Sequence, residues 1–215
     1  MLFDLDGTLV DTTYVHTVVW WEAFARHGYQ IPMAQIHRAI GMGSDQLIPH
    51  LLGHAPTPAR QRALRAEHDQ EYRRYWGRLC PLPGARDLVR WCAERGYQVV
   101  LASSGSAEEV RMLRDLLDVD PLVAAATSAD DASVSKPAPD LLHAALDQVG
   151  ADHAEAVLVG DSVWDVLAAR RCGLPCVGVE CGGTSAAELR AAGAVEVHPS
   201  PAQLCQVWAE RGGPG

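Results

Sequence analysis

Lysine is nearly absent from this sequence. Of its 18 lysines and arginines, a single one, Lys136, is a lysine. Lysine carries a compact ammonium on a flexible stem, whereas arginine presents a wide planar fork, so the two cannot replace each other at a tight site. We therefore expect position 136 to require a small point charge, although one lysine could also remain by chance at the surface.

The sequence also lacks a long apolar run and a basic segment followed by an apolar core. The first absence argues against a helix that spans a bilayer. The second indicates that there is no signal peptide. We therefore expect a cytoplasmic protein with no membrane partner. The first predicted strand begins at Met1 itself, so it is expected to be short, and whether residues precede it is left open.

Excess positive charge and the Cys-x-x-Cys motif are absent as well. The formal net charge of -9 at pH 7 argues against a nucleic-acid partner, because phosphate backbones require a basic face. Without a secretory signal, we expect the cysteines to be buried thiols and expect neither disulfides nor a zinc site on Cys172, Cys176 and Cys181. The six cysteines are Cys80, Cys92, Cys172, Cys176, Cys181 and Cys205.

What is present is an alternation of strand-like and helical patterns after a purely helical stretch. The pattern is helical from about residue 12 to 79, and Cys80-Pro81-Leu82-Pro83-Gly84 is a strong linker signal. Beyond it, strands and helices alternate, which predicts a parallel sheet covered on both faces. The predicted strands after the linker cover residues 97–102, 122–126, 156–159, 175–179 and 195–197.

We therefore predict an α/β fold with two parts. A Rossmann-like, doubly wound parallel sheet forms the core from residues 1–11 and 82–215. An all-helical cap, residues 12–81, is inserted after the first strand. A chain of 215 residues is long enough for one core and such an insertion.

Two aspartates follow the first apolar segment, Met1–Phe3. They are Asp4 and Asp6, and Gly7-Thr8 comes directly after them. In open α/β sheets, ligands bind at the carboxyl ends of the strands. Two carboxylates this close repel each other unless a cation lies between them or one holds a proton. The pair therefore predicts a divalent metal, an acid/base role, or both, with a plain polar turn as the alternative.

Two further polar segments follow later strands. Ser103-Ser104-Gly105 could bind an anion at a helix N-terminus, and Ser106 with Glu109 predicts a capping box there. Lys136 lies in a loop stiffened by two prolines, where its charge would bind a phosphoryl group and offset nearby carboxylates. The simpler interpretations are a strand-end serine and a surface lysine.

A third segment, Gly160-Asp161, follows another apolar strand, and Asp165 comes four residues later. The two carboxylates would lie on one face of the first helical turn, although acidic residues also favour helix N-termini as caps. Carboxylates, a hydroxyl and an ammonium at the ends of several strands are together the components of metal-assisted phosphoryl transfer.

These motifs occur in the order and spacing typical of the haloacid dehalogenase superfamily. Over essentially its whole length, the sequence resembles the branch with a helical cap after the first strand, which includes phosphoglycolate phosphatases and β-phosphoglucomutases. The resemblance implies that Asp4 is the nucleophile that forms an aspartyl-phosphate and that Asp6 is the acid and base.

The resemblance also implies the remaining site residues. The phosphoryl group would be held by Ser103, Ser104 and Lys136. The cofactor would be Mg²⁺, and its implied ligands are Asp4, the backbone oxygen of Asp6, Asp161 and Asp165, the last either as a ligand or behind the ligands. The cap would close over the site and select the substrate. The candidates on the cap are His16, Gly41, Met42, Gly43 and Ser44.

Within the superfamily, the residues favour a Mg²⁺-dependent phosphatase that acts on a small phosphorylated metabolite. Dehalogenases lack the second aspartate, which is present here as Asp6. Phosphonate-cleaving relatives use a cap lysine, and residues 12–81 contain none. A binding module without turnover is a third class, and the complete set of acidic residues and Lys136 argues against it.

A β-phosphoglucomutase-like mutase is the alternative within the family. His16 and Trp20 match the pattern of those enzymes. Against the mutase, residues 41–45 contain no arginine for a second phosphate, and Gly160 stands where mutases carry an acidic residue. The identity of the substrate, and whether the protein is a monomer or a homodimer, are left open.

Overall fold

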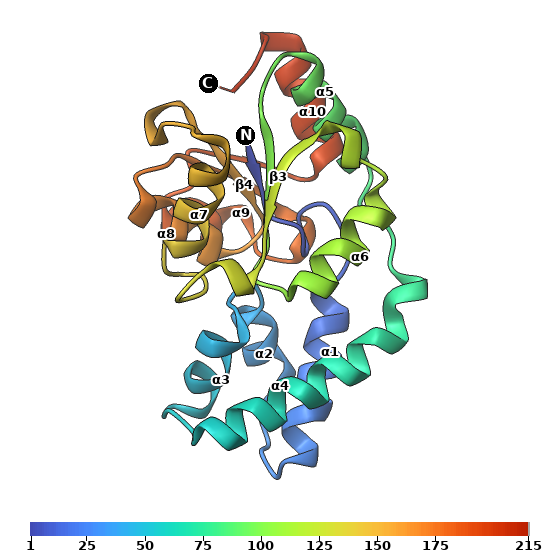
Figure 1. The fold of residues 1–215 in the computed structure, drawn as a ribbon, viewed down its shortest axis with the longest axis vertical. Coiled ribbons are helices and arrows are strands. Elements are labelled where there is room, and N and C mark those ends of the chain that lie inside the picture. Colours follow the sequence, from blue (N-terminus) through green and yellow to red (C-terminus); the bar gives the residue numbers. More distant parts are fainter. Residues whose placement is uncertain (215) are drawn as a thin grey trace.

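The computed structural model describes residues 1–214 and contains a six-stranded, all-parallel sheet with helices on both faces (Figure 1). The strand order is β3-β2-β1-β4-β5-β6, which places the first strand in the middle of the sheet. The α/β class and the doubly wound sheet with an inserted helical cap are therefore confirmed. The strands are β1 (Leu2–Phe3), β2 (Val99–Ala102), β3 (Val123–Thr127), β4 (Leu158–Gly160), β5 (Cys176–Val179) and β6 (Glu196–His198).

The central strands are apolar along their whole length because both of their faces are covered. Leu2 and Phe3 point to opposite faces and belong to different hydrophobic clusters. One face packs against α5 (Ala85–Glu94), α6 (Ala107–Leu117) and α10 (Pro201–Arg211). The other face packs against α7 (Asp140–Val149), α8 (Val163–Cys172) and α9 (Ala186–Ala192).

The helical cap lies between β1 and β2 and has a hydrophobic cluster of its own, which includes Trp20, Phe24 and Leu64. In Figure 1 it occupies the blue and teal end of the molecule, below the sheet. Its elements are α1 (Thr13–Arg26), α2 (Met33–Ala39), α3 (Ser44–Leu52), α4 (Pro58–Tyr72) and the 3-10 helix η1 (Arg73–Arg78).

The two connections between cap and sheet run side by side. The backbone N–H of Asp11 donates to the Cys80 carbonyl at 3.0 Å, and that of Leu82 donates to the Leu9 carbonyl at 2.9 Å. The outgoing and returning chains therefore lie next to each other, close to the end of β1. The domain boundaries at residues 11/12 and 81/82, which belong to these two connections, stay a prediction.

Several local predictions need correction. The helical pattern predicted up to about residue 79 is not a regular α-helix at its end, because α4 ends at Tyr72 and η1 continues in a tighter winding that accompanies packing of Tyr75 and Trp76 against the core. Cys80 lies in the connection and is exposed, and Cys181 and Cys205 are only partly buried, so the prediction that the cysteines are buried is wrong at these three positions. The remaining 3-10 helices are η2 (Asp120–Leu122), η3 (Ala129–Asp131), η4 (His153–Glu155) and η5 (Glu180–Gly182). Within residues 1–214, no helix combines the length and hydrophobicity needed to cross a membrane.

Candidate active site

The carboxyl ends of three neighbouring strands bring together most of the predicted site residues. Asp4 follows β1, Ser103 follows β2 and Asp161 follows β4, and these strands are adjacent in the sheet. The strand order reverses direction between β1 and β4, which is the point where doubly wound sheets bind ligands. The helical cap covers this end of the sheet (Figure 1).

Lys136 is fully buried beneath this edge, so the surface interpretation of this lysine is wrong. Its ammonium donates to Asp4 Oδ1 at 2.6 Å and to the Ala102 carbonyl at 2.9 Å. It also forms an ion pair with Asp165 Oδ1 at 2.8 Å. Burial disfavours the charged form, but Asp165 and Asp4 outweigh burial and raise the pKa of Lys136.

Two buried carboxylates contact this ammonium, and a third, that of Asp161, lies beside them. Oxygens of Asp4, Asp161 and Asp165 lie within 4.8 Å of one another. Burial raises the pKa of Asp4 to about 7, with Lys136 opposing and Asp165 adding to the shift. Burial and the Asp165 charge also raise the pKa of Asp161 well above its ordinary value. This excess of negative charge and the all-oxygen donor set fit a divalent cation such as Mg²⁺.

The three acids differ in how free they are to bind a metal. Asp165 Oδ2 accepts hydrogen bonds from Ser162 N at 3.1 Å and Ser162 Oγ at 2.6 Å, so it caps α8, while its other oxygen pairs with Lys136. Asp165 therefore caps its helix as predicted, and its role at a metal site stays a prediction. Asp161 Oδ1 accepts one hydrogen bond, from Thr8 Oγ1 at 3.0 Å, and its other oxygen is available to a cation.

Asp6 is held by hydrogen bonds on both of its oxygens. Oδ1 accepts from Thr12 Oγ1 at 2.7 Å and from His16 Nε2 at 3.2 Å, and Oδ2 accepts from Ser103 Oγ at 3.1 Å. Burial works against ionisation, but the hydrogen bond and charge of His16, with Thr12 and Ser103, lower the pKa of Asp6. The Ser103 hydroxyl therefore orients Asp6 in this structure.

His16 reaches from the cap helix α1 into the core and lies between two acids. Its Nε2 is 3.2 Å from Asp6 Oδ1 and 3.2 Å from Glu109 Oε1. Burial disfavours the imidazolium, but the hydrogen bonds and charges of Asp6 and Glu109 raise the pKa of His16 to about 10. The predicted capping box at α6 is wrong for this reason. Ser106 Oγ accepts from the Glu109 backbone, but the Glu109 carboxylate faces His16.

A second histidine continues this network within the cap. His16 Nδ1 lies 3.1 Å from His68 Nε2, and His68 Nδ1 lies 3.0 Å from Asp69 Oδ1. A doubly protonated His16 donates to His68 Nε2, so His68 is neutral and carries its proton on Nδ1. Burial, aided by the charge of His16 and opposed by Asp69, lowers the pKa of His68 to about 4.

A small cavity of about 70 Å³ connects these residues. The cap residues Gly41, Met42 and Ser44 line it as predicted candidates, whereas Gly43 packs against Ser135 in the loop before Lys136. The buried Ser104 hydroxyl also faces this cavity region and has no hydrogen-bond partner in the described structure. The core residues in its wall are Asp4, Asp6, Ser104, Gly105, Ser106 and Glu109.

Sequence reasoning missed the place of four charged or titratable residues in this cavity, namely Arg65, His68, Asp69 and Glu109. Arg65 supplies the one permanent cation among the residues that line the cavity and lies 3.8 Å from Asp69. Arg65 and His68 sit three residues apart on α4, in a segment rich in arginine and glutamate. The sequence pattern there indicates a solvated helix face and gives no signal that one side meets the core.

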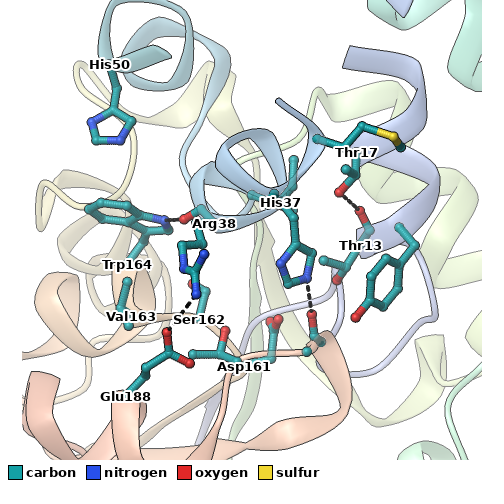
Figure 2. A pocket seen from close by; sticks show the side chains of 17 residues that line it. Thr13, Thr17, His37, Arg38, His50, Asp161, Ser162, Val163, Trp164 and Glu188 are labelled. Carbon is teal, nitrogen blue, oxygen red and sulfur yellow. Dashed lines mark hydrogen bonds and ion pairs between the residues drawn. The ribbon is translucent and has the colours of Figure 1, made fainter. Parts of the chain in front are cut away.

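A larger cavity of about 540 Å³ lies beside Asp161 and Ser162, between cap and core (Figure 2). His37 Nε2 lies 3.1 Å from the Gly182 carbonyl, and Trp164 Nε1 donates to the Arg38 carbonyl at 2.8 Å. Arg38 also pairs with Glu188 at 3.7 Å. Neither Asp4 nor Asp6 lines this space, so we assign the chemistry to the smaller cavity, which both of them line.

Comparison with known proteins identifies similar chains. A family model described as haloacid dehalogenase-like hydrolase matches residues 1–173. A phosphoglycolate phosphatase from Caulobacter vibrioides is 29% identical over 191 residues, which are 85% of this chain and 79% of that protein. A phosphonoacetaldehyde hydrolase from Bordetella pertussis is 30% identical over 207 residues, which are 86% of this chain and 74% of that protein. The crystal structure of a hydrolase from Pseudomonas syringae superposes with a TM-score of 0.92 at 34% identity, over 97% of each chain.

Proposed function

The chain belongs to the haloacid dehalogenase-like hydrolases, and on this basis we propose that it is a Mg²⁺-dependent phosphatase acting on a small phosphorylated metabolite. One observation carries the proposal. Asp4 lies at the end of the central strand, bonded to a buried ammonium and beside two further buried carboxylates, with Asp6 at the wall of the same cavity.

Asp4 is the proposed nucleophile. One of its oxygens forms a bond to the phosphorus of the substrate as the bond from phosphorus to the ester oxygen breaks, which yields an aspartyl-phosphate. Lys136 fixes the orientation of Asp4, and its positive charge attracts the phosphoryl group. The unpartnered Ser104 hydroxyl can donate to a phosphoryl oxygen, and Ser103 can do so once its hydroxyl turns away from Asp6. Water then attacks the phosphorus and releases Asp4 and inorganic phosphate.

Asp4, Asp161 and the backbone oxygen of Asp6 are the proposed Mg²⁺ ligands, and Asp165 lies behind them. When bound, the ion supplies positive charge that favours approach of the phosphoryl group to the Asp4 carboxylate. Lys136 and Ser162 occupy the oxygens of Asp165, so this acid holds Lys136 in place for Asp4.

Asp6 is the proposed acid and base. It gives a proton to the departing ester oxygen and later takes one from the attacking water. In the present conformation His16 favours the ionised form of Asp6, which suits the second step. The first step requires the protonated form of Asp6, and a weaker contact with His16 would raise the pKa of Asp6 toward that form.

A compact substrate with a second anionic group fits the cavity best. The space is small, and Arg65 provides a cation on the wall formed by the cap. A relative that is 29% identical is named phosphoglycolate phosphatase, and 2-phosphoglycolate carries a carboxylate besides its phosphate. We therefore propose it as the first substrate to assay within a screen of phosphorylated metabolites.

The hydrogen bond from His16 to Asp6 also favours a second candidate, the mutase, whose pattern His16 matches. The two functions differ in their products. Given β-glucose 1-phosphate with a bisphosphate activator, a mutase forms glucose 6-phosphate without free phosphate, and a phosphatase releases phosphate.

The deciding experiment measures hydrolysis of p-nitrophenyl phosphate and 2-phosphoglycolate with Mg²⁺. We expect EDTA to abolish activity and added Mg²⁺ to restore it. Asp4→Asn should lower kcat at least about 1,000-fold, because it removes the nucleophile. Asp11→Asn is the matched control, since Asp11 is exposed and lies seven residues further along the chain. Full activity of Asp4→Asn would overturn the mechanism, and no turnover of any phosphate ester would overturn the proposed function.

A further inference from the structure

Two histidines and a cysteine meet on the face of the sheet core that carries α7 and α8. His143 lies in the first turns of α7, His153 begins η4, and Cys172 is the last residue of α8. One ligand atom from each lies within 4.8 Å of the other two. The cluster lies outside both cavities described above and shares no residue with the candidate active site.

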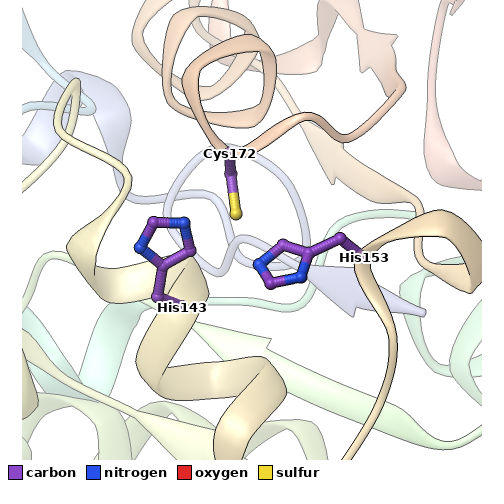
Figure 3. A group of neighbouring side chains, drawn as sticks. All are labelled: His143, His153 and Cys172. Carbon is purple, nitrogen blue, oxygen red and sulfur yellow. The ribbon is translucent and has the colours of Figure 1, made fainter.

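The three side chains are directed toward a common point. Figure 3 shows the Cys172 sulfur pointing into the space between the two imidazole rings. The ring centroids of His143 and His153 are 5.3 Å apart, and the rings are inclined by 73°. Neither imidazole makes a hydrogen bond in the part of the chain that the structure describes, so their ring nitrogens are not engaged elsewhere.

We propose that His143, His153 and Cys172 form a binding site for a Zn²⁺-type ion, separate from the Mg²⁺ site. Two imidazole nitrogens and a thiolate are the ligands that Zn²⁺ prefers, and tetrahedral zinc commonly combines three protein ligands with water. His143 is exposed, so the ion can enter from solvent. Zinc–nitrogen and zinc–sulfur bonds of roughly 2.0–2.3 Å require the ligand atoms to draw slightly closer than 4.8 Å, which side-chain rotation permits.

Ion binding converts the Cys172 thiol to a thiolate and releases one proton to solvent. Cys172 is 6% exposed, and burial raises the pKa of its thiol to about 11. The free thiol is therefore protonated at neutral pH, and the ion must displace that proton. Affinity should consequently rise with pH.

The spacing of the cysteines along the chain gave no indication of this site. The group Cys172, Cys176 and Cys181 is dispersed in the fold, because Cys176 lies within β5 and Cys181 contacts the Gly7 carbonyl near the active site. The ligands that join Cys172 come from elements about 20 to 30 residues earlier, and the packing of α7 against α8 brings them together.

Co²⁺ is the probe, because a cobalt–thiolate bond gives charge-transfer absorption in the near ultraviolet and oxygen ligands do not. The untagged protein is titrated with Co²⁺ in the presence of saturating Mg²⁺, which occupies the carboxylate site. We expect the thiolate band to reach a plateau at one ion per chain and to disappear when Zn²⁺ is added.

Matched variants identify the ligands. Cys172→Ser should remove the band, and His143→Gln should weaken Co²⁺ binding by about 100-fold or more. Cys181→Ser is the control, because Cys181 is the cysteine beside the other metal site, and it should keep the band. Because His143 is exposed, His143→Gln tests the site without disturbing the core.

Thermal unfolding gives a second measurement. Zn²⁺ at about 100 times its dissociation constant should raise the melting temperature of the wild-type protein by roughly 5–10 °C more than that of Cys172→Ser. The proposal is overturned if wild-type protein shows no thiolate band, if Cys172→Ser retains the band, or if His143→Gln binds Co²⁺ as tightly as wild type. Phosphatase activity enters none of these readouts, so they stand whatever the enzyme assays give.

Discussion

Lys136 shows at the scale of one residue why this chain contains a lysine at all. Its ammonium is fully buried and lies within 2.9 Å of an Asp4 oxygen, a backbone carbonyl and an Asp165 oxygen. Three acceptors around one nitrogen match the three hydrogens of an ammonium, whereas a planar guanidinium would need a wider space. The charge of Lys136 allows Asp4 and Asp165 to be buried together.

Arg65 carries the first residue-scale prediction. If it binds a second anionic group of the substrate, Arg65→Gln should raise the KM for 2-phosphoglycolate by roughly 10–100-fold, because a hydrogen bond to a charged group contributes about 1.5–3 kcal/mol. The KM for p-nitrophenyl phosphate, which has no second anion, should change little.

Arg62→Gln is the matched control, since Arg62 lies on the same helix and is exposed. Steady-state kinetics with both substrates measures the effect. An equal change in KM for the two substrates would assign Arg65 a structural role in the cap instead.

At the scale of elements, the site depends on how closely η5 approaches the end of β4. Gly182 lies against Asp161, and a Cβ atom at this position would overlap the Asp161 carboxylate. Gly182→Ala should therefore displace Asp161 and lower kcat by about 100-fold, since displacement of a reacting group by about 1 Å has an effect of that size.

A steric origin of this effect can be checked directly. Gly77 in η1 is the control position, because it resembles Gly182 in not adopting a left-handed backbone conformation. A Cβ at Gly77 meets nothing within 4 Å, so Gly77→Ala should retain activity. If the Asp161 displacement is the cause, a higher Mg²⁺ concentration should partly restore Gly182→Ala. Wild-type kcat in Gly182→Ala would contradict the argument.

The elements also show which parts of the site can be predicted from sequence. Asp4, Ser103 and Asp161 each follow an apolar strand, and parallel strands end at one edge, so local patterns suffice to bring them together. Arg65 and Glu109 lie on helices, and the rotation of each helix about its own axis is fixed only by packing between cap and core. No local pattern shows whether the Glu109 carboxylate caps its own helix or faces His16.

The strand boundaries were predicted to within one or two residues, because buried strands end where turn residues begin. The 3-10 helix η1 was not predicted, because its aromatic side chains Tyr75 and Trp76 pack against a core that the local sequence does not reveal. The same reasoning explains why the sequence did not predict the proposed metal site at Cys172, whose ligands meet only through tertiary packing.

At the scale of the whole molecule, cap and core are joined by a buried network with one charged histidine and one neutral histidine. His16 is protonated because it faces Asp6 and Glu109, and His68 is neutral because it is buried next to His16. His68 also stacks on Trp20 with ring centroids 4.2 Å apart, which ties the network to the hydrophobic cluster of the cap. The two histidines therefore give the junction opposite responses to pH.

His68 makes the junction sensitive to acid. Its pKa is 6.5 in its ordinary state and about 4 in the folded protein, so below pH 6.5 the unfolded chain takes up a proton that the folded chain does not. The free energy of unfolding should fall as the pH drops from 6.5 to about 4, by up to about 3 kcal/mol from this residue. In His68→Gln this contribution is absent.

Urea unfolding between pH 7 and 4 should therefore show the difference in stability between wild type and His68→Gln narrowing with acid. His54→Gln, in an exposed cap loop, should keep a constant difference from wild type. A constant difference for His68→Gln as well would mean that folding leaves the pKa of His68 at its ordinary value, which would contradict the lowered pKa assigned to it.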